Sequence, residues 1–288
     1  MQQRWSPFAS RPGTVVLPVM FHHIYKNGWN VRYSQEISER TFLEFVARAR
    51  ELGFETITTT QLTAFLDHND LIPPRSMILI LDDRRLKVVK EYFLPLWEEY
   101  NWTVTLAYIS GPEVTWKEWE EIETLAATGA IDVQAHGYLH NEESYVRDQT
   151  PEDVILQEIN APLPILESHT GGRPQAIIWP GGHFNTFGVT AARQAGYQLG
   201  FTVYSRGPLM FNWIPLGEAE KAVGDPRMVL PRAWSSEAAK KLELAAQIGE
   251  QARMHAERNY EQEARWYREV CGGELRPVSR KQQSLSIE

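Results

Sequence analysis

The sequence predicts an α/β fold, namely a distorted (β/α) barrel of about seven to eight units with a C-terminal helical extension. Three observations lead to this prediction. Short apolar runs alternate along the chain with segments of helical periodicity, which is the pattern of a parallel sheet covered by helices. The runs contain few polar residues, as expected of strands that are buried on both faces. The 288 residues are enough to form one barrel of this kind.

The first half of the chain shows the alternation most clearly. Strands are expected at residues 14–21, 56–59, 76–81 and 103–109. Helical segments are expected at residues 40–54, 61–68, 86–100 and 116–129. In the first of these helices the apolar residues recur on one face, and Gly53 is a stop signal. In the third helix Pro95 predicts a kink, because proline lacks the N–H that an internal helical turn needs.

The second half of the chain continues the pattern and then changes character. Further strands are expected at residues 131–135, 174–179, 199–203 and 227–232, with helical segments between most of them. Residues 235–270 are rich in strong helix formers, with Ser235 or Ser236 as the N-cap and the Gly272–Gly273 pair as the end. We interpret this segment as one long helix or a broken pair, packed on the barrel or on a partner.

The predicted organisation is therefore a barrel at residues 1–235 and an extension at residues 236–288. The polar tail from Arg276 onward has the composition of a disordered segment.

Composition and charge exclude several functional classes. The net charge of -8 gives no basic patch for nucleic acid, and neither GxGxxG nor GxxxxGK[ST] occurs, so a nucleotide-binding function is also disfavoured. The one cysteine, Cys271, permits no disulfide and no cysteine-rich metal site within one chain. No segment has the pattern of a signal peptide or a transmembrane helix. The expected location is the cytoplasm, or outside it if the sequence is a trimmed piece.

Polar residues follow two of the expected strands at the point where each strand ends. Asp82 and Asp83 follow the strand at 76–81, and His136 and His140 come directly after the strand at 131–135. Active sites of (β/α) barrels lie at these carboxyl ends of the strands. Asp83 and the two histidines make a set of ligands suited to a divalent transition metal such as zinc. A cation would also offset the repulsion between the two adjacent carboxylates.

The order of these motifs resembles that of the polysaccharide deacetylase superfamily, whose first two signatures are a strand ending in Asp-Asp and a His-x-x-x-His. The chain is most similar to the branch that deacetylates poly-N-acetylglucosamine. That branch has three more motifs, which match FHHI (21–24), WPGG (179–182) and LPRAW (230–234). The resemblance extends from Val15 to Trp234 and implies the deacetylase barrel.

The resemblance implies a role for each matched residue. The metal ligands would be Asp83, His136 and His140, and the ion would be zinc, with nickel or cobalt as alternatives. Asp82 would be the general base and His22 the acid, with His23 as the competitor if the strand register slips by one residue. Arg232 would position Asp82 or keep it ionised, the alternative being a structural salt bridge.

The turn WPGG and the rim of the site would bind the substrate, an N-acetylated saccharide. The residues expected there are Trp179, Pro180, Gly182, His183 and Arg84. The chain departs from the family pattern at three positions: Arg84 replaces a glycine, Gly137 replaces a serine or threonine, and Gly181 replaces an aromatic residue. Arg84 and Gly181 together suggest an unusual substrate, for example an anionic one, or a chain that has lost turnover. His183 has the alternative of being an ordinary loop histidine.

Three functional hypotheses follow from these patterns. The first is a metal-dependent N-deacetylase that releases acetate from an amino sugar or a polysaccharide. The second is a related hydrolase acting on cyclic imides or other amides. The third is a catalytically degenerate binding or assembly module that forms homo-oligomers through its C-terminal helix.

Overall fold

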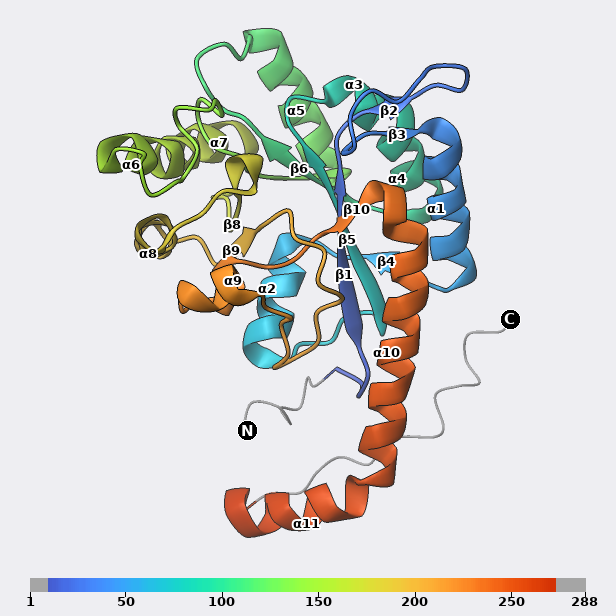
Figure 1. Cartoon of the computed structure of the whole chain (residues 1–288). Coiled ribbons are helices and arrows are strands. Elements are labelled where there is room, and N and C mark those ends of the chain that lie inside the picture. The colour runs from blue at the N-terminus through green and yellow to red at the C-terminus, as the bar shows by residue number, and fades with distance from the viewer. Residues whose placement is uncertain (1–9, 273–288) are drawn as a thin grey trace.

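A curled parallel sheet forms the centre of the molecule in the computed structural model, which describes residues 10–272 (Figure 1). The main path of the sheet has the order β10-β1-β5-β6-β7-β8-β9, and β4 pairs with β5 beside it. The strands are β1 (Val15–Phe21), β4 (Glu55–Thr56), β5 (Arg75–Asp82), β6 (Val104–Tyr108), β7 (Ile131–Ala135), β8 (Ala176–Ile178), β9 (Leu199–Phe201) and β10 (Ala233–Trp234). The central strands β1, β5 and β6 are almost entirely buried, as their apolar runs predicted.

The segment at residues 230–234 links the two ends of this sheet and closes the barrel. Leu230 bridges to Phe201 of β9, and its N–H donates to the Gly200 carbonyl at 2.7 Å. Three residues later Ala233 pairs with Val19 of β1. The predicted distorted barrel is therefore confirmed. The strand expected at 227–232 was placed wrongly, because the 3₁₀ turn η4 (Pro226–Met228) occupies its start and the strand itself follows at β10.

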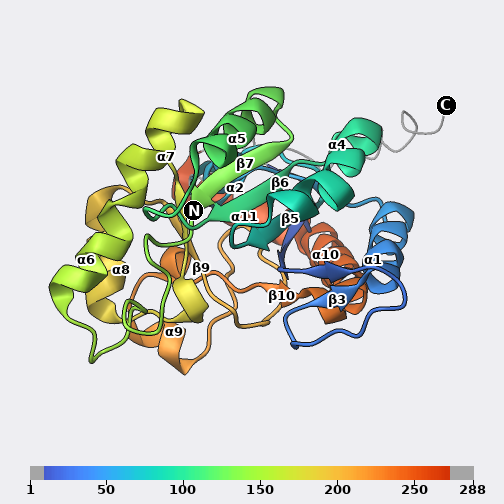
Figure 2. The same ribbon diagram turned by 90° about the horizontal axis from the view of Figure 1, so that it is seen from above.

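Helices surround the sheet when the molecule is seen from above (Figure 2). The bounds are α1 (Glu39–Glu51), α2 (Thr59–His68), α3 (Leu86–Val88), η2 (Val89–Phe93), α4 (Leu94–Tyr100), α5 (Trp116–Thr128), α6 (Glu152–Asn160), α7 (Pro162–Thr170), α8 (Thr186–Ala195) and α9 (Glu218–Ala222). Pro95 lies in the first turn of α4, directly after the π-helical turn η2, and the kink expected there stays a prediction. Outside the barrel, β2 (Ile24–Tyr25) and β3 (Ile37–Ser38) form a separate two-stranded sheet.

The C-terminal extension is a broken pair of helices, one of the two forms expected. After the 3₁₀ turn η5 (Ser235–Glu237), α10 (Ala238–Arg258) packs against β1 and α1, and α11 (Tyr260–Cys271) turns away beyond the end of the barrel (Figure 1). The serine N-cap was predicted wrongly, because Ser235 and Ser236 lie in the 3₁₀ turn and Glu237 precedes α10. Gly272 ends α11 in a left-handed conformation, as expected.

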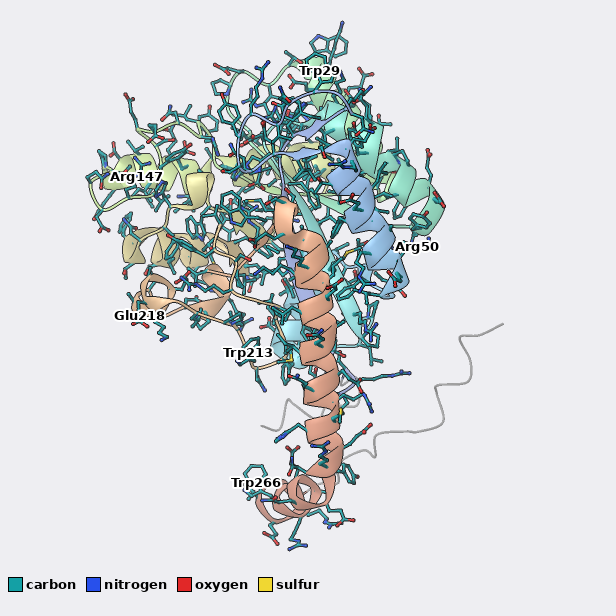
Figure 3. All side chains as sticks on the ribbon, turned by 45° about the vertical axis from the view of Figure 1, so that its right-hand side comes forward. Trp29, Arg50, Arg147, Trp213, Glu218 and Trp266 are labelled. Carbon is teal, nitrogen blue, oxygen red and sulfur yellow. The ribbon has the colours of Figure 1, made fainter. Side chains whose placement is uncertain are left out.

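The outer end of the extension carries an apolar side chain that the barrel does not cover. Trp266 projects from α11 at a distance from the barrel (Figure 3) and is 38% exposed. The polar tail expected from Arg276 lies outside the described residues. The division at residue 235 stays a prediction.

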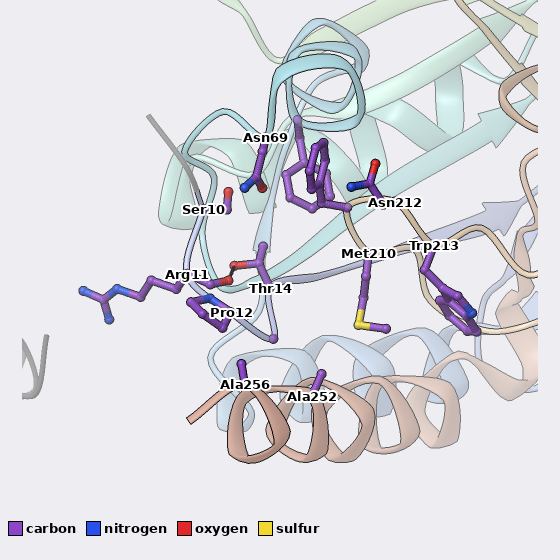
Figure 4. A pocket seen from close by; sticks show the side chains of 13 residues that line it. Ser10, Arg11, Pro12, Thr14, Asn69, Met210, Asn212, Trp213, Ala252 and Ala256 are labelled. Atoms are coloured by element: carbon purple, nitrogen blue, oxygen red, sulfur yellow. Dashed lines mark hydrogen bonds between the residues drawn. The ribbon is translucent and has the colours of Figure 1, made fainter. Parts of the chain in front are cut away.

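A cavity of about 350 Å³ lies where the chain enters β1, at the opposite edge of the sheet from the predicted site residues. It is bounded by residues 10–14, by the loop at 210–213 and by Ala252 and Ala256 of α10 (Figure 4). No helix within residues 10–272 has the length and apolar character needed to cross a membrane.

Candidate metal centre and active site

The carboxyl ends of three strands of the sheet position the residues that carry the chemistry. His22 follows β1, Asp82 is the last residue of β5, and His136 follows β7. Because β1, β5, β6 and β7 are paired in parallel, these ends meet at the upper edge of the barrel in Figure 1. The side chains that the sequence placed in one site are therefore brought together by the strands themselves.

Asp83, His136 and His140 form a cluster with the geometry of a metal site. Each offers one ligand atom, and these atoms all lie within 4.8 Å of one another. The rings of the two histidines are 4.4 Å apart between centroids, and His136 Nε2 is 3.8 Å from Asp83 Oδ1. Two imidazoles and a carboxylate with open positions beside them suit zinc or a similar divalent ion.

Two of the three cluster residues have strained backbones. Asp83 has a φ of 72° and His140 a φ of 51°, in the left-handed region that residues other than glycine rarely adopt. Such conformations cost on the order of 1 kcal/mol each and persist only where the surroundings impose them. The chain thus keeps both residues in conformations that turn their side chains toward His136.

A hydrogen bond to the backbone fixes the orientation of His136. Its Nδ1 lies 2.8 Å from the carbonyl oxygen of Ile178, the last residue of β8. A carbonyl oxygen only accepts, so Nδ1 carries the proton and Nε2 presents its lone pair to the cluster. Histidine ligands of metals are commonly held in this way.

Glu158 supports the metal-site loop, a role that was not predicted from the sequence. This residue of α6 is 1% exposed, and its carboxylate accepts hydrogen bonds from the backbone N–H groups of Tyr138 (2.9 Å), Leu139 (2.7 Å) and His140 (3.3 Å). Glu158 lies on the buried face of α6 beside Ile155 and Ile159. A charged residue within an apolar helical stripe is the sequence signal that could have identified it.

Gly137 makes room for this carboxylate. It has a φ of 77°, and a Cβ at this position would lie 2.4 Å from Glu158 Oε2 and 2.8 Å from Pro180 Cγ. A serine or threonine therefore does not fit at position 137 in this chain. The hydrogen bonds that Glu158 accepts support the loop next to Gly137.

Asp82 is held by a buried ion pair. It is 2% exposed, and Arg232 Nη1 donates to its Oδ1 at 2.6 Å. Burial by itself would raise the pKa of Asp82, but the charges of Arg232, His136 and His22 outweigh that effect and lower the pKa to about 2. Arg232 also donates to the Thr202 carbonyl at 2.7 Å, which fixes its direction. Asp82 is therefore a carboxylate at neutral pH.

Of the two adjacent histidines, His22 faces the site. Its Nε2 lies 3.7 Å from Asp82 Oδ2. The ring of His23 instead packs against Tyr25 with 4.5 Å between centroids. Strand alternation directs the two side chains to opposite sides, and the register is the one that brings His22 to the acid pair.

Burial keeps His140 uncharged in the metal-free protein. Burial, together with the neighbouring His136, lowers its pKa from 6.5 to about 4 against the opposing effect of Asp83. A neutral imidazole is the form that binds a metal.

The turn after β8 contains three buried residues that were expected to contact substrate. Trp179 is 0% exposed, and its Nε1 donates to the Met228 carbonyl at 2.6 Å, so its ring is enclosed by the protein, and its role in substrate binding stays a prediction. Pro180 and Gly182 are also buried. The left-handed Gly182 lies against Val203, where a Cβ would come within 2.5 Å. These three residues shape the turn.

His183 and Arg84 each contact other groups of the protein. His183 Nε2 is 2.9 Å from Arg147 Nη2, and its ring stacks on Tyr145. The guanidinium of Arg84 turns toward the loop after β6, where Nε donates to the Ile109 carbonyl at 2.9 Å. Nη2 also donates to the Gly111 carbonyl at 3.4 Å, so two of its nitrogens hold the loop at residues 109–111, and substrate binding by Arg84 stays a prediction.

The family model for polysaccharide deacetylase matches residues 72–200 of the chain. The match covers less than half of the 288 residues. The predicted resemblance is confirmed over these residues, which include Asp82, Asp83, His136 and His140. His22 and Arg232 lie outside the matched range and are brought to the site by strand pairing in the barrel.

Solved structures share the fold of this chain at low sequence identity. The Streptococcus pyogenes deacetylase PplD is 16% identical, with a TM-score of 0.65, and the match covers 82% of this chain and 99% of that one. IcaB from Ammonifex degensii is 20% identical, with a TM-score of 0.61 and coverages of 83% and 99%. A de-N-acetylase from Aggregatibacter actinomycetemcomitans is 13% identical, with a TM-score of 0.60 and coverages of 76% and 94%. No curated protein matches the chain.

Proposed function

We propose that this protein is a metal-dependent hydrolase that removes N-acetyl groups from an amino sugar or a polysaccharide and releases acetate. The observation that carries the proposal is the cluster of Asp83, His136 and His140 beside a second, ionised acid, Asp82. The deacetylase family match and the folds of PplD and IcaB support the same function. The matched motifs favour N-acetylglucosamine polymers as the substrate.

The fit of the donors supports a divalent transition metal, with zinc first and nickel or cobalt as alternatives. When bound, such an ion supplies Lewis acidity toward the acetamido carbonyl. Asp83, His136 and His140 would hold it, and the hydrogen bond between His136 and Ile178 presents the required nitrogen.

Asp82 and His22 divide the proton transfers between them. Asp82 would accept a proton from the attacking water as the water oxygen bonds to the carbonyl carbon. His22, whose Nε2 lies beside Asp82, would donate a proton to the amine nitrogen as the C–N bond breaks. Acetate and a free amino sugar are the products. Arg232 acts through Asp82, since its charge keeps that carboxyl ionised in a buried position.

The proposal is tested by metal content and acetate release. Elemental analysis of the purified protein should find about one divalent transition metal per chain, as three-ligand sites bind one ion. N-acetylglucosamine oligomers should then yield acetate, and Asp82→Asn should lower turnover by about 10²–10⁴-fold while metal stays bound. Full turnover by the metal-loaded Asp82→Asn variant would show that the assignment of the base is wrong.

The adjacent histidines give a matched pair of variants. His22→Ala should lower turnover by about 10²-fold or more, because the leaving amine loses its acid. His23→Ala should leave turnover near the wild-type value, because its ring faces Tyr25 rather than Asp82. Equal losses in the two variants would contradict the role of His22.

Self-association through the C-terminal helices stays a prediction, and light scattering on a chain shortened at residue 237 tests it.

A further inference from the structure

The ring of Tyr145 occupies the space beside Gly181 in the turn after β8. A Cβ at Gly181 would lie 2.9 Å from Cε2 and 3.1 Å from Cζ of Tyr145. These separations are shorter than ordinary van der Waals contact, so no side chain fits at position 181 while Tyr145 keeps its place. The absence of a side chain at Gly181 thus makes room for an aromatic ring that comes from a different segment.

Tyr145 lies directly beside the metal cluster. Its ring meets that of His140 edge to face, with 5.5 Å between centroids and an interplanar angle of 80°. On its outer side it stacks with His183 at 5.3 Å and 30°. The ring is partly exposed, so it separates the cluster from the rim without being enclosed in the core.

A chain of polar contacts holds this ring in position. The guanidinium carbon of Arg147 lies 5.0 Å from the centroid of Tyr145, a cation–π distance. Arg147 also pairs with Glu142 at 2.8 Å and contacts His183 Nε2 at 2.9 Å. In Figure 3 Arg147 is seen on the same side of the molecule as the helices α6 and α7 of Figure 1. An aromatic residue with few rotatable bonds and fixed neighbours offers a preorganised surface to a ligand.

We propose that Tyr145 is a specificity-determining residue, and that its ring forms the wall against which the acetylated sugar ring packs. The inference rests on the proposed deacetylase function and adds the contact surface for the sugar. Sugars present apolar C–H faces, and aromatic side chains bury a large area at a defined orientation. Neither Trp179, which is buried, nor Gly181 can supply such a ring from the turn.

The alternative role is structural, in which Tyr145 only supports His140. The two roles predict different measurements. A wall for the sugar contributes to binding in the ground state, so its loss raises KM and weakens binding. A support for the ligand weakens metal binding instead.

The test uses the full chain with Tyr145→Ala, Tyr145→Phe and, as a matched control, Tyr33→Ala. Tyr33 is another tyrosine, 61% exposed in the loop between β2 and β3. Binding of an N-acetylglucosamine pentamer to metal-free protein is measured by calorimetry, zinc affinity by competition with a chelator, and KM by acetate release. Tyr145→Ala should weaken pentamer binding and raise KM by about tenfold, with zinc affinity within about twofold of the wild type. Tyr145→Phe keeps the ring and should resemble the wild type, as should Tyr33→Ala.

The outcomes separate this inference from the proposed function. If the wild type releases acetate but Tyr145→Ala keeps its pentamer affinity and KM, the wall is elsewhere and the inference falls alone. A loss of zinc affinity with unchanged pentamer binding would assign Tyr145 the supporting role and also overturn the inference. If the wild type binds the pentamer through Tyr145 but releases no acetate, only the deacetylase function falls. A wild type that neither binds nor hydrolyses the pentamer would overturn both.

Discussion

The two sides of the candidate site are built by different means. The acid side consists of Asp82, His22 and Arg232, which come from β5, from the end of β1 and from the segment before β10. The histidine side consists of residues 136–145 together with the turn at Gly181. Paired strands and a buried ion pair position the residues of the acid side. Left-handed backbone conformations and the hydrogen bonds that Glu158 accepts position those of the histidine side.

This difference determines how each side depends on its neighbours. On the acid side the backbone is regular, so replacing a charged side chain leaves its partner unpaired but does not change the course of the backbone. On the histidine side the backbone itself is strained at His140 and tightly bounded at Gly137, so its path depends on the contacts that hold it. We therefore expect stability to be most sensitive on the acid side and metal affinity on the histidine side.

Arg232→Met should cause the largest change. It removes the partner of a carboxylate that is 2% exposed, and breaking a buried pair typically costs about 3–5 kcal/mol of unfolding free energy. The measurement is urea unfolding of the metal-free protein at neutral pH.

The double variant Arg232→Met with Asp82→Asn is the control for this first prediction. It removes both charges and should recover a substantial part of the loss, because no unpaired charge remains buried. A loss below about 1 kcal/mol in the single variant would mean that the pair behaves like a surface salt bridge. The contrast between the two sides would then disappear.

Glu158→Gln should act mainly on metal binding. The amide keeps one acceptor oxygen but turns an NH₂ group toward the N–H groups of residues 138–140, so the loop that carries His140 loses part of its support. Changes to groups that orient metal ligands typically weaken affinity by about 10–100-fold, and zinc competition measures this. Glu152→Gln, at an exposed position of the same helix, is the control and should bind zinc normally. If both variants bind zinc alike, Glu158 does not position the loop.

The fold was predictable from sequence because strand periodicity and turn residues are local signals. The runs at β1, β5, β6 and β7 agree with the expected segments to within one or two residues. The prediction failed at residues 227–232, since the closing segment is stabilised by bridges to Phe201 and Val19 that lie far away in the chain. A strand of two residues carries too little pattern of its own to be recognised.

The site residues that lie at or directly after the ends of strands were predictable from the sequence. The residues that fill space beside a glycine of another segment were not. The sequence brought Asp82, Asp83, His136 and His140 to one edge, and the structure assembles them there. It also indicated substrate contacts for Trp179, but a motif does not reveal whether a ring points inward. Glu158 and Tyr145 were missed for a related reason. Each fills the space beside a glycine, and nothing in the sequence shows that the two residues of such a pair are in contact.

The smallest effect that we expect is a dependence of the unfolding free energy on pH. It arises because the two sides of the site differ in whether they favour a charged group. The acid side stabilises a charge, since the pKa of Asp82 is lowered to about 2. The histidine side excludes one, since burial lowers the pKa of His140 from 6.5 to about 4. As pH falls below 6.5, the unfolded chain therefore binds a proton at this residue before the folded chain does, so protonation favours unfolding. The stability that neutral His140 contributes is complete above about pH 6.5 and is lost as pH falls toward about 4.

One group of this kind changes the unfolding free energy by at most about 1.4 kcal/mol per pH unit within that window. Urea unfolding of the metal-free wild type and of His140→Gln between pH 7 and pH 4.5 measures the effect (the range follows from the usual histidine pKa of about 6.5). The wild type should lose stability more steeply than the variant, because the variant has no proton to bind at this position. Parallel curves would mean that His140 titrates alike in the folded and unfolded chains. The histidine side would then accommodate a charged group as the acid side does. Burial would not be the reason that His140 is in the neutral form that binds a metal.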